Sequence, residues 1–135
     1  MTDTMKPSLS YTIICDDVRQ EEGGKISLMG LFENIYALSF PVLQPRLALM
    51  SEWENGRGDF EMMTRLLTPD RKTTLRETVS RITVNDTYRK HRDVSVHINI
   101  EFPAPGTYWI EHSIDGELVS SIPLVVIQVK EQAFH

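Results

Sequence analysis

A strict alternation of apolar and polar residues over positions 94–102 constrains the fold more than any other feature of the sequence. Every second position in this stretch is apolar, namely Val94, Val96, Ile98, Ile100 and Phe102. A two-residue period is typical of a half-buried β-strand, because successive side chains point to opposite faces of a sheet. We therefore expect this strand to bury its apolar side chains and to expose the polar ones, including His97.

Two turn signals follow this strand and predict a three-stranded meander. The first turn spans 103–106, the alternation resumes over 108–114, and Asp115-Gly116 leads into the apolar run 122–129. If consecutive strands pair, Phe102 lies opposite Tyr108. A three-residue loop with glycine in its left-handed position would set His112, on the inward face, opposite Leu118.

A second hairpin is predicted around Asn55-Gly56, which is the strongest short hairpin signal in the chain. A two-residue loop between strands 46–54 and 57–67 sets Ser51 opposite Phe60 and Leu49 opposite Met62. Directly opposed residues share a face, so this register gathers six apolar side chains on one side: Leu47, Leu49, Trp53, Phe60, Met62 and Leu66.

Further strands are predicted over 8–15, 25–32, 35–40 and 73–84. The first is expected to turn Ile13 and Cys15 inward and Thr12 outward. The last carries several charges, which indicates an edge strand, although a helix also fits its apolar spacing. About eight or nine strands with regular turn signals predict an all-β fold, a single immunoglobulin-like antiparallel β-sandwich over residues 1–135. Residues 1–7 and 130–135 are expected to fray.

Composition narrows the setting and the partners. A chain of 135 residues with 41% hydrophobic residues can bury one core. Its net charge of −5 disfavours a nucleic-acid partner, which would need a basic face. The lone Cys15 cannot form an internal disulfide, and no apolar run approaches the ~20 residues of a membrane span. We expect a cytoplasmic protein that binds neither nucleic acid nor membrane.

The acidic segment 16–24 is the first candidate binding site. It holds four carboxylates with one arginine among them: Asp16, Asp17, Arg19, Glu21 and Glu22. Clustered carboxylates on a loop could bind a hard cation such as Ca²⁺. Their spacing does not match the twelve-residue calcium loop, and a pair between Asp17 and Arg19 within a solvated loop explains the residues as well. We therefore predict no metal site.

Two other features could contact a partner. A basic run over 88–92, which includes Arg89, Lys90 and Arg92, could meet an acidic protein or a phosphate, or could be a solvated loop. Trp109 is expected to face outward, where it could contact a protein or a sugar or be covered by a loop or a second subunit. Several apolar residues also fall on faces predicted to be outward: Met29, Leu31, Met50, Met63 and Leu67. A protomer interface would bury them, and a wrong inside/outside assignment of one hairpin would also account for them.

No pattern in the chain indicates catalysis. A nucleophilic enzyme needs a base beside Ser, Thr or Cys, and neither a nucleophile elbow nor a phosphate-binding loop is present. His97 and His112 are predicted on opposite faces, so they cannot share an ion. We predict no catalytic residues and no cofactor.

The opening motif resembles a small bacterial family of uncharacterised proteins. It consists of Ile14-Cys15-Asp16-Asp17-Val18-Arg19-Gln20-Glu21 followed by Gly24-Lys25-Ile26-Ser27-Leu28-Met29-Gly30, and the similarity extends to the closing hairpins around 106–109 and 115–116. The resemblance implies a bacterial, cytosolic setting and supplies no activity or site residue.

The function that this pattern favours is a non-enzymatic protein-binding or assembly module, with self-association as a homodimer among its forms. One alternative is a ligand- or cation-binding sandwich that uses the acidic segment 16–22. A second is an enzyme without a recognisable motif.

Overall fold

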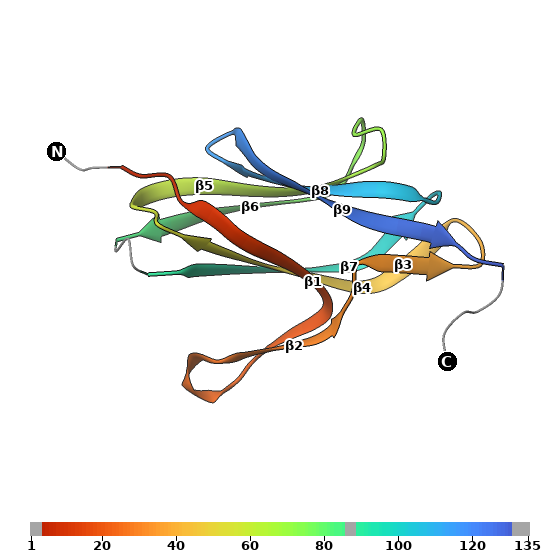
Figure 1. Cartoon of the computed structure of the whole chain (residues 1–135), viewed down its shortest axis with the longest axis horizontal. Coiled ribbons are helices and arrows are strands. Elements are labelled where there is room, and N and C mark those ends of the chain that lie inside the picture. The colour runs from red at the N-terminus through yellow and green to blue at the C-terminus, as the bar shows by residue number, and fades with distance from the viewer. Residues whose placement is uncertain (1–3, 86–88, 131–135) are drawn as a thin grey trace.

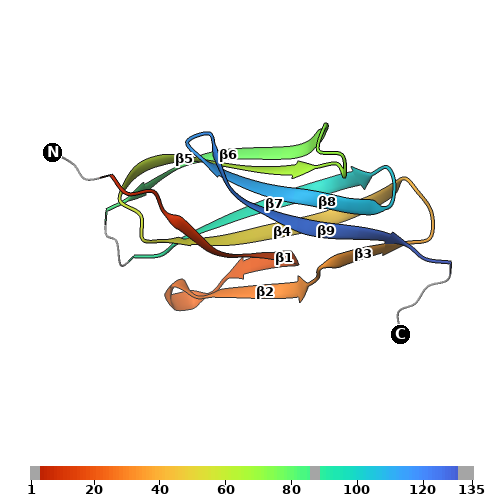
Figure 2. The same cartoon turned by 45° about the horizontal axis from the view of Figure 1, so that its top comes forward.

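The chain is an all-β sandwich, as the alternation predicts. The computed structural model describes residues 4–85 and 89–130, which form two layers of strands (Figures 1 and 2). The helix alternative for 73–84 is wrong, since that segment is a strand at the edge of its sheet. Residues 1–3 and 131–135, which were expected to fray, lie outside the described residues.

The strands divide into a four-stranded sheet and a five-stranded sheet. The four-stranded sheet has the order β2 (Ile26–Leu31), β1 (Ser8–Gln20), β4 (Val42–Glu54), β7 (His91–Phe102). The five-stranded sheet has the order β3 (Asn34–Ala37), β9 (Glu117–Gln128), β8 (Gly106–Ile114), β5 (Gly58–Leu67), β6 (Thr74–Val84). All neighbours are antiparallel except β3 and β9, which are parallel.

The predicted hairpin at Asn55-Gly56 is wrong, because β4 and β5 belong to different sheets. Asn55 has a φ of 63°, but Gly56 does not take the second positive φ that a type I′ turn requires. A Cβ at Gly56 would lie 2.8 Å from the Pro7 side chain, so the glycine is needed for close packing. The six predicted core residues are buried, but they face one another across the sandwich.

The N-terminal segment is part of this arrangement. The backbones of Met5 and Arg57 exchange hydrogen bonds of 2.9 and 2.8 Å, and Lys6 forms an ion pair with Glu117. Residues 4–7 were expected to fray and instead close the end of the sandwich over the β4–β5 connection.

The predicted meander fails in the same way at its first turn. β7 pairs with β4, and β8 pairs with β5 and β9. Phe102 and Tyr108 therefore meet edge to face across the core, with ring centroids 4.9 Å apart, instead of as cross-strand neighbours. Only β8 and β9 form the expected hairpin, through a two-residue turn at Asp115-Gly116.

The register after that turn also differs from the prediction. Both turn residues have positive φ, 48° and 81°, so Ile114 lies directly opposite Glu117. A bulge beside Ser113 then sets His112 opposite Ser120, where a three-residue loop would have set it opposite Leu118.

The alternation in β7 changes face at Asn99, which overturns its predicted orientation. Ile100 and Phe102 point into the core, but Val94, Val96 and Ile98 are 43%, 40% and 50% exposed. Asn99 has a φ of 55°, and it lies opposite Pro45, which cannot donate a backbone hydrogen bond. This left-handed residue shifts the inward positions, so His97 is buried where exposure was predicted.

β1 changes face for a similar reason. A bulge between Leu9 and Tyr11 brings Thr12 and Ile14 to the inner face and leaves Ile13 and Cys15 on the outer face. After Cys15 the strand leaves β4 and continues with β2 as a two-stranded ribbon that projects from the sandwich (Figure 1).

The core consists of two apolar clusters. One contains Leu47, Leu49, Leu66, Ile100, Phe102, Tyr108, Ile110 and Leu124, and the other contains Trp53, Phe60, Met62, Ile82, Val84 and Ile114. Polar residues from both sheets lie between them and form the buried network described below.

Candidate functional site

The outer face of the four-stranded sheet carries an apolar surface, which we call the apolar face. Register places its side chains in rows across the strands: Ile13, Met50 and Val94 in one row, and Leu31, Cys15, Ala48 and Val96 in the next, with Ile98 beyond them. Leu31 is 61% exposed, and the three β7 residues are also exposed. An apolar row on the solvent side of a sheet is unusual unless something covers it.

Small side chains form the floor of the apolar face. Cys15 and Ala48 are fully buried beneath their larger neighbours, and Met50 is nearly so. Burial raises the pKa of the Cys15 thiol, so it stays protonated and packs as a small hydrophobic group. Cys15 was correctly expected to be buried, but on the wrong side of the sheet.

Ion pairs lie at both ends of the apolar face. At one end the Arg46 guanidinium lies 2.8 Å from Asp17 and holds the pKa of that carboxyl below its usual range. At the other end the buried Glu52 carboxylate accepts from Tyr11 Oη at 3.1 Å and from Arg92 Nε at 3.2 Å. Lys90 Nζ lies 3.7 Å from the same carboxylate. The charges that border the face are therefore neutralised within the chain.

The acidic candidates do not converge. β1 runs through Gln20, so Asp16 and Asp17 lie on a strand and point to opposite faces, and only Glu21 and Glu22 lie in the turn. Arg19 lies 3.7 Å from Asp17, which agrees with the predicted pair. Within residues 4–85 and 89–130, no group of three or more His, Cys, Asp or Glu side chains is arranged to hold a metal ion.

Gly30 explains where the Asp16 side chain lies. A Cβ at position 30 would lie 2.2 Å from Asp16 Oδ2, so the carboxylate occupies the space above the glycine. The glycine therefore makes room for a carboxylate from the adjacent strand.

The basic candidates separate into two environments. Lys90 and Arg92 contact Glu52, while Arg89 is exposed. Tyr88, which belonged to the predicted cluster, lies outside the described residues.

Trp109 lies on the outer face of the five-stranded sheet, where its own chain covers it. The Arg71 guanidinium sits 4.2 Å from the Trp109 ring centroid and 3.4 Å from Glu111. The loop covering that sequence analysis allowed for Trp109 is therefore present. Met63 shares this face of the sandwich, whereas Met50 lies on the opposite one, so one flat interface cannot bury both methionines.

A buried network joins the two sheets around His112. Its Nε2 lies 2.9 Å from Thr12 Oγ1 and 3.4 Å from Ser51 Oγ, and its Nδ1 lies 2.9 Å from Thr64 Oγ1. Burial lowers the pKa of His112 to about 4, so the imidazole is neutral at pH 7. His112 was predicted to be a buried, satisfied histidine, but its partners were not predicted, because Thr12 was placed on the outer face.

Asp93 of β7 points to the same side as its partner Ser51. Burial raises the pKa of the Asp93 carboxyl. The poorly solvated position therefore disfavours the ionised form of this carboxyl.

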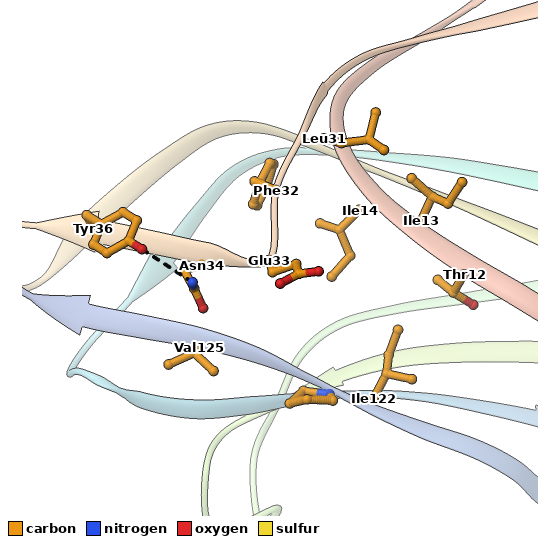
Figure 3. Close-up of a pocket in the computed structure, with 11 residues that line it drawn as sticks. Thr12, Ile13, Ile14, Leu31, Phe32, Glu33, Asn34, Tyr36, Ile122 and Val125 are labelled. Atoms are coloured by element: carbon orange, nitrogen blue, oxygen red, sulfur yellow. Dashed lines mark hydrogen bonds between the residues drawn. The ribbon is translucent and has the colours of Figure 1, made fainter. Parts of the chain in front are cut away.

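A groove of about 770 Å³ separates β1 from β9 (Figure 3). Ile13 and Ile14 line one side, Ile122 and Val125 line the other, and the β2–β3 connection closes one end. The groove could not be predicted from the sequence, because it depends on how far apart two strands of different sheets lie.

The protein is therefore a β-sandwich domain with one apolar outer face and an open groove between its layers. The chain belongs to a family of unknown function (DUF6941), whose model matches residues 10–127. The expected membership of an uncharacterised family is thereby confirmed. No curated protein matches the chain. Across residues 4–85 and 89–130 there is no helix with the length and apolar character that crossing a membrane requires.

Proposed function

We propose that this protein is a non-enzymatic assembly module that self-associates through the apolar face. The observation that carries the proposal is the outward orientation of Val94, Val96 and Ile98 on the same face of the sheet as the exposed Leu31. Exposed apolar patches on a soluble protein mark interaction sites, since their burial against another surface is favourable.

The charges around the apolar face support a second copy of the chain as the occupant. Asp17 is paired with Arg46, and Glu52 is paired with Arg92 and Lys90. A strongly charged partner would have to compete with these internal pairs. An identical face brings a matching apolar surface that is bordered by charges already paired within their own chain, which suits an isologous dimer.

The environment of His112 supports a structural role over a catalytic one. Its contacts with Ser51 and Thr12 resemble a nucleophile beside a base. His112 is 1% exposed, so a substrate would have to enter the core of the sandwich to reach it.

The bacterial and cytoplasmic setting and the immunoglobulin-like relationship stay predictions. They are compatible with an assembly module, and the proposal does not depend on them.

Sedimentation velocity over a concentration series tests the proposal. The wild-type chain is expected to pass from monomer to dimer as its concentration rises. Val96→Asp is expected to weaken dimerisation by on the order of a hundredfold or more, because each dimer would bury two unpaired carboxylates.

Val79→Asp is the matched control. Val79 is 53% exposed on the outer face of the five-stranded sheet, and its replacement should leave the dimer intact. A wild-type chain that stays monomeric at all concentrations contradicts the proposal, and so does an equal loss of dimer in both variants.

A further inference from the structure

The sandwich is open along the side where β1 and β9 approach each other. β1 pairs with β4 from Ser8 to Cys15, but its pairing with β2 starts only at Cys15. β9 pairs with β8 along its length, but its pairing with β3 starts only at Val125. Among the described residues, the first part of each strand therefore has a strand neighbour on one side only.

The backbone of β1 points hydrogen-bonding groups into this opening. The Phe32 N–H donates to the Ile14 carbonyl at 3.0 Å, so the main-chain groups of Ile14 face the groove side. Main-chain groups two residues apart on a strand point the same way, so the N–H and C=O of Thr12 face the groove as well. An extended segment laid beside β1 would pair with them.

The β9 edge of the opening can form fewer backbone hydrogen bonds with an added strand than the β1 edge can. The Val125 N–H donates to the Glu33 carbonyl at 3.4 Å, so the backbone of Pro123, two residues earlier, also faces the groove. Proline has no N–H, which blocks a full ladder on that edge. The occupant should therefore pair with β1 and contact β9 through side chains.

The lining of the groove sets the side chains that the occupant should carry. Ile14 and Ile122 lie toward the core, and Ile13 and Leu31 lie toward the outer face, so a strand between them would meet apolar walls on both sides. The volume of about 770 Å³ falls within the roughly 300–1,000 Å³ of ligand pockets.

One charge in the groove selects for its opposite. Figure 3 shows the Glu33 carboxylate on the β2–β3 connection, among the residues that line the groove. No ion pair joins Glu33 to any residue in 4–85 or 89–130. A basic side chain at one end of the occupant would pair with it.

We propose that the groove binds an extended peptide strand, with apolar β-branched residues and one lysine or arginine, by β-augmentation of the β1 edge at Thr12. This site goes beyond the proposed self-association, because it takes a different occupant in a groove that adjoins the apolar face at Ile13 and Leu31. The peptide adds its backbone to β1, packs its side chains against Ile14 and Ile122, and places its cation at Glu33.

The test uses the full chain and synthetic peptides that alternate valine and threonine. One set carries a single terminal lysine at either end, and the other carries glutamate instead. We expect saturable binding with on the order of a tenfold preference for a lysine peptide. Glu33→Lys should reverse the preference, whereas Glu101→Lys, at an exposed position on β7, should leave it unchanged.

Amide hydrogen exchange supplies a second readout. Peptide binding should slow exchange at Thr12, because its N–H gains a partner. The proposal is overturned if none of the peptides binds saturably, if Glu33→Lys leaves the preference unchanged, or if binding occurs without protection at Thr12. Saturable binding of an apolar dye without that protection would instead assign the groove to small apolar molecules. Glu33→Lys is expected to leave the dimer intact, so this site can fail while self-association holds.

Discussion

The outer faces of the two sheets differ in the side chains that they present to solvent. On the five-stranded sheet, solvent-facing charges of opposite sign lie directly opposite each other: Glu61 with Arg81, and Arg65 with both Glu77 and Glu111. On the four-stranded sheet, two neighbouring rows are entirely apolar, and charged residues lie in the rows that flank them. The paired charges of the first face are compatible with exposure to water, whereas the second face is expected to be buried against another molecule.

The difference arises at few positions. The left-handed Asn99 turns Val94, Val96 and Ile98 outward, and the bulge near Leu9 does the same for Ile13 and Cys15. Both irregularities lie in strands of the four-stranded sheet. A local change of backbone thus converts a strand that could have joined the core into part of a surface.

The largest predicted effect concerns the core that both faces share. His112 has a pKa of about 4 in the folded chain, below the 6.5 of an unhindered histidine. At a pH between these values, His112 is protonated in the unfolded chain and neutral in the folded chain. Stability should therefore fall by up to about 3 kcal/mol as the pH drops from about 6.5 to about 4. Urea unfolding across this range measures the change.

A His112→Gln variant isolates this contribution. Burial also lowers the pKa of His97, which acts in the same direction, and raises that of Asp93, which acts in the opposite one. The variant is expected to be less stable at pH 7 and to lose most of the pH slope. An unchanged slope would remove His112 as its cause. Unfolding of one sheet before the other would break the comparison, because His112 contacts both sheets.

The second prediction compares the buried carboxylate of each face. Glu52 has contacts at 3.1, 3.2 and 3.7 Å, whereas Glu111 has contacts at 3.4 and 3.9 Å. Glu52→Gln should cost about 1–2 kcal/mol of unfolding free energy, and Glu111→Gln should cost less than about 1 kcal/mol. Parallel denaturant titrations measure both losses, and a larger loss for Glu111→Gln would reverse the ranking.

The third prediction concerns the cover over Trp109. Arg71→Ala should expose the ring and cost about 0.5–1 kcal/mol, since the guanidinium also contacts Glu111. Acrylamide quenching of tryptophan fluorescence should increase, because Trp53 is fully buried and contributes little to it. Unchanged quenching would show that Arg71 does not shield the ring in solution.

The smallest predicted effect is the cost of an aspartate on either face to the monomer itself. Val96→Asp and Val79→Asp should each change monomer stability by less than about 0.5 kcal/mol, because both side chains face solvent. Thermal unfolding at concentrations below the dimer midpoint checks this. A much larger loss for Val96→Asp alone would indicate that the apolar face stabilises the fold and does not merely await a partner.

Most of the strands and much of the core could be predicted from the sequence, because a two-residue period identifies a strand whatever it pairs with. Pairing could not. Leu49 and Met62 are buried in the observed arch between two sheets. They would also be buried in the predicted hairpin, so the apolar pattern does not distinguish a hairpin from an arch. Asp115 and Gly116 both have positive φ and form a hairpin turn. In Asn55-Gly56 only the asparagine has positive φ, and the glycine packs against Pro7.

The site was harder to predict than the fold. Leu31 and Met50 were correctly placed on an outward face, but the same set included Met63 and Leu67, which lie on the outer face of the other sheet. Residues such as Val96 were assigned to the core, because nothing in the alternation marks Asn99 as left-handed. The groove and the partners of His112 depend on contacts between sheets, which a period along one strand does not encode.

Methyl-selective NMR over a dilution series tests the central claim most directly, because it compares the two faces in one sample. The account predicts that the methyl resonances of Val94, Val96 and Ile98 shift as the concentration falls, while those of Val79 on the opposite face stay in place. Resonances of the apolar face that do not move with concentration, or a shift at Val79 of the same size, would contradict it.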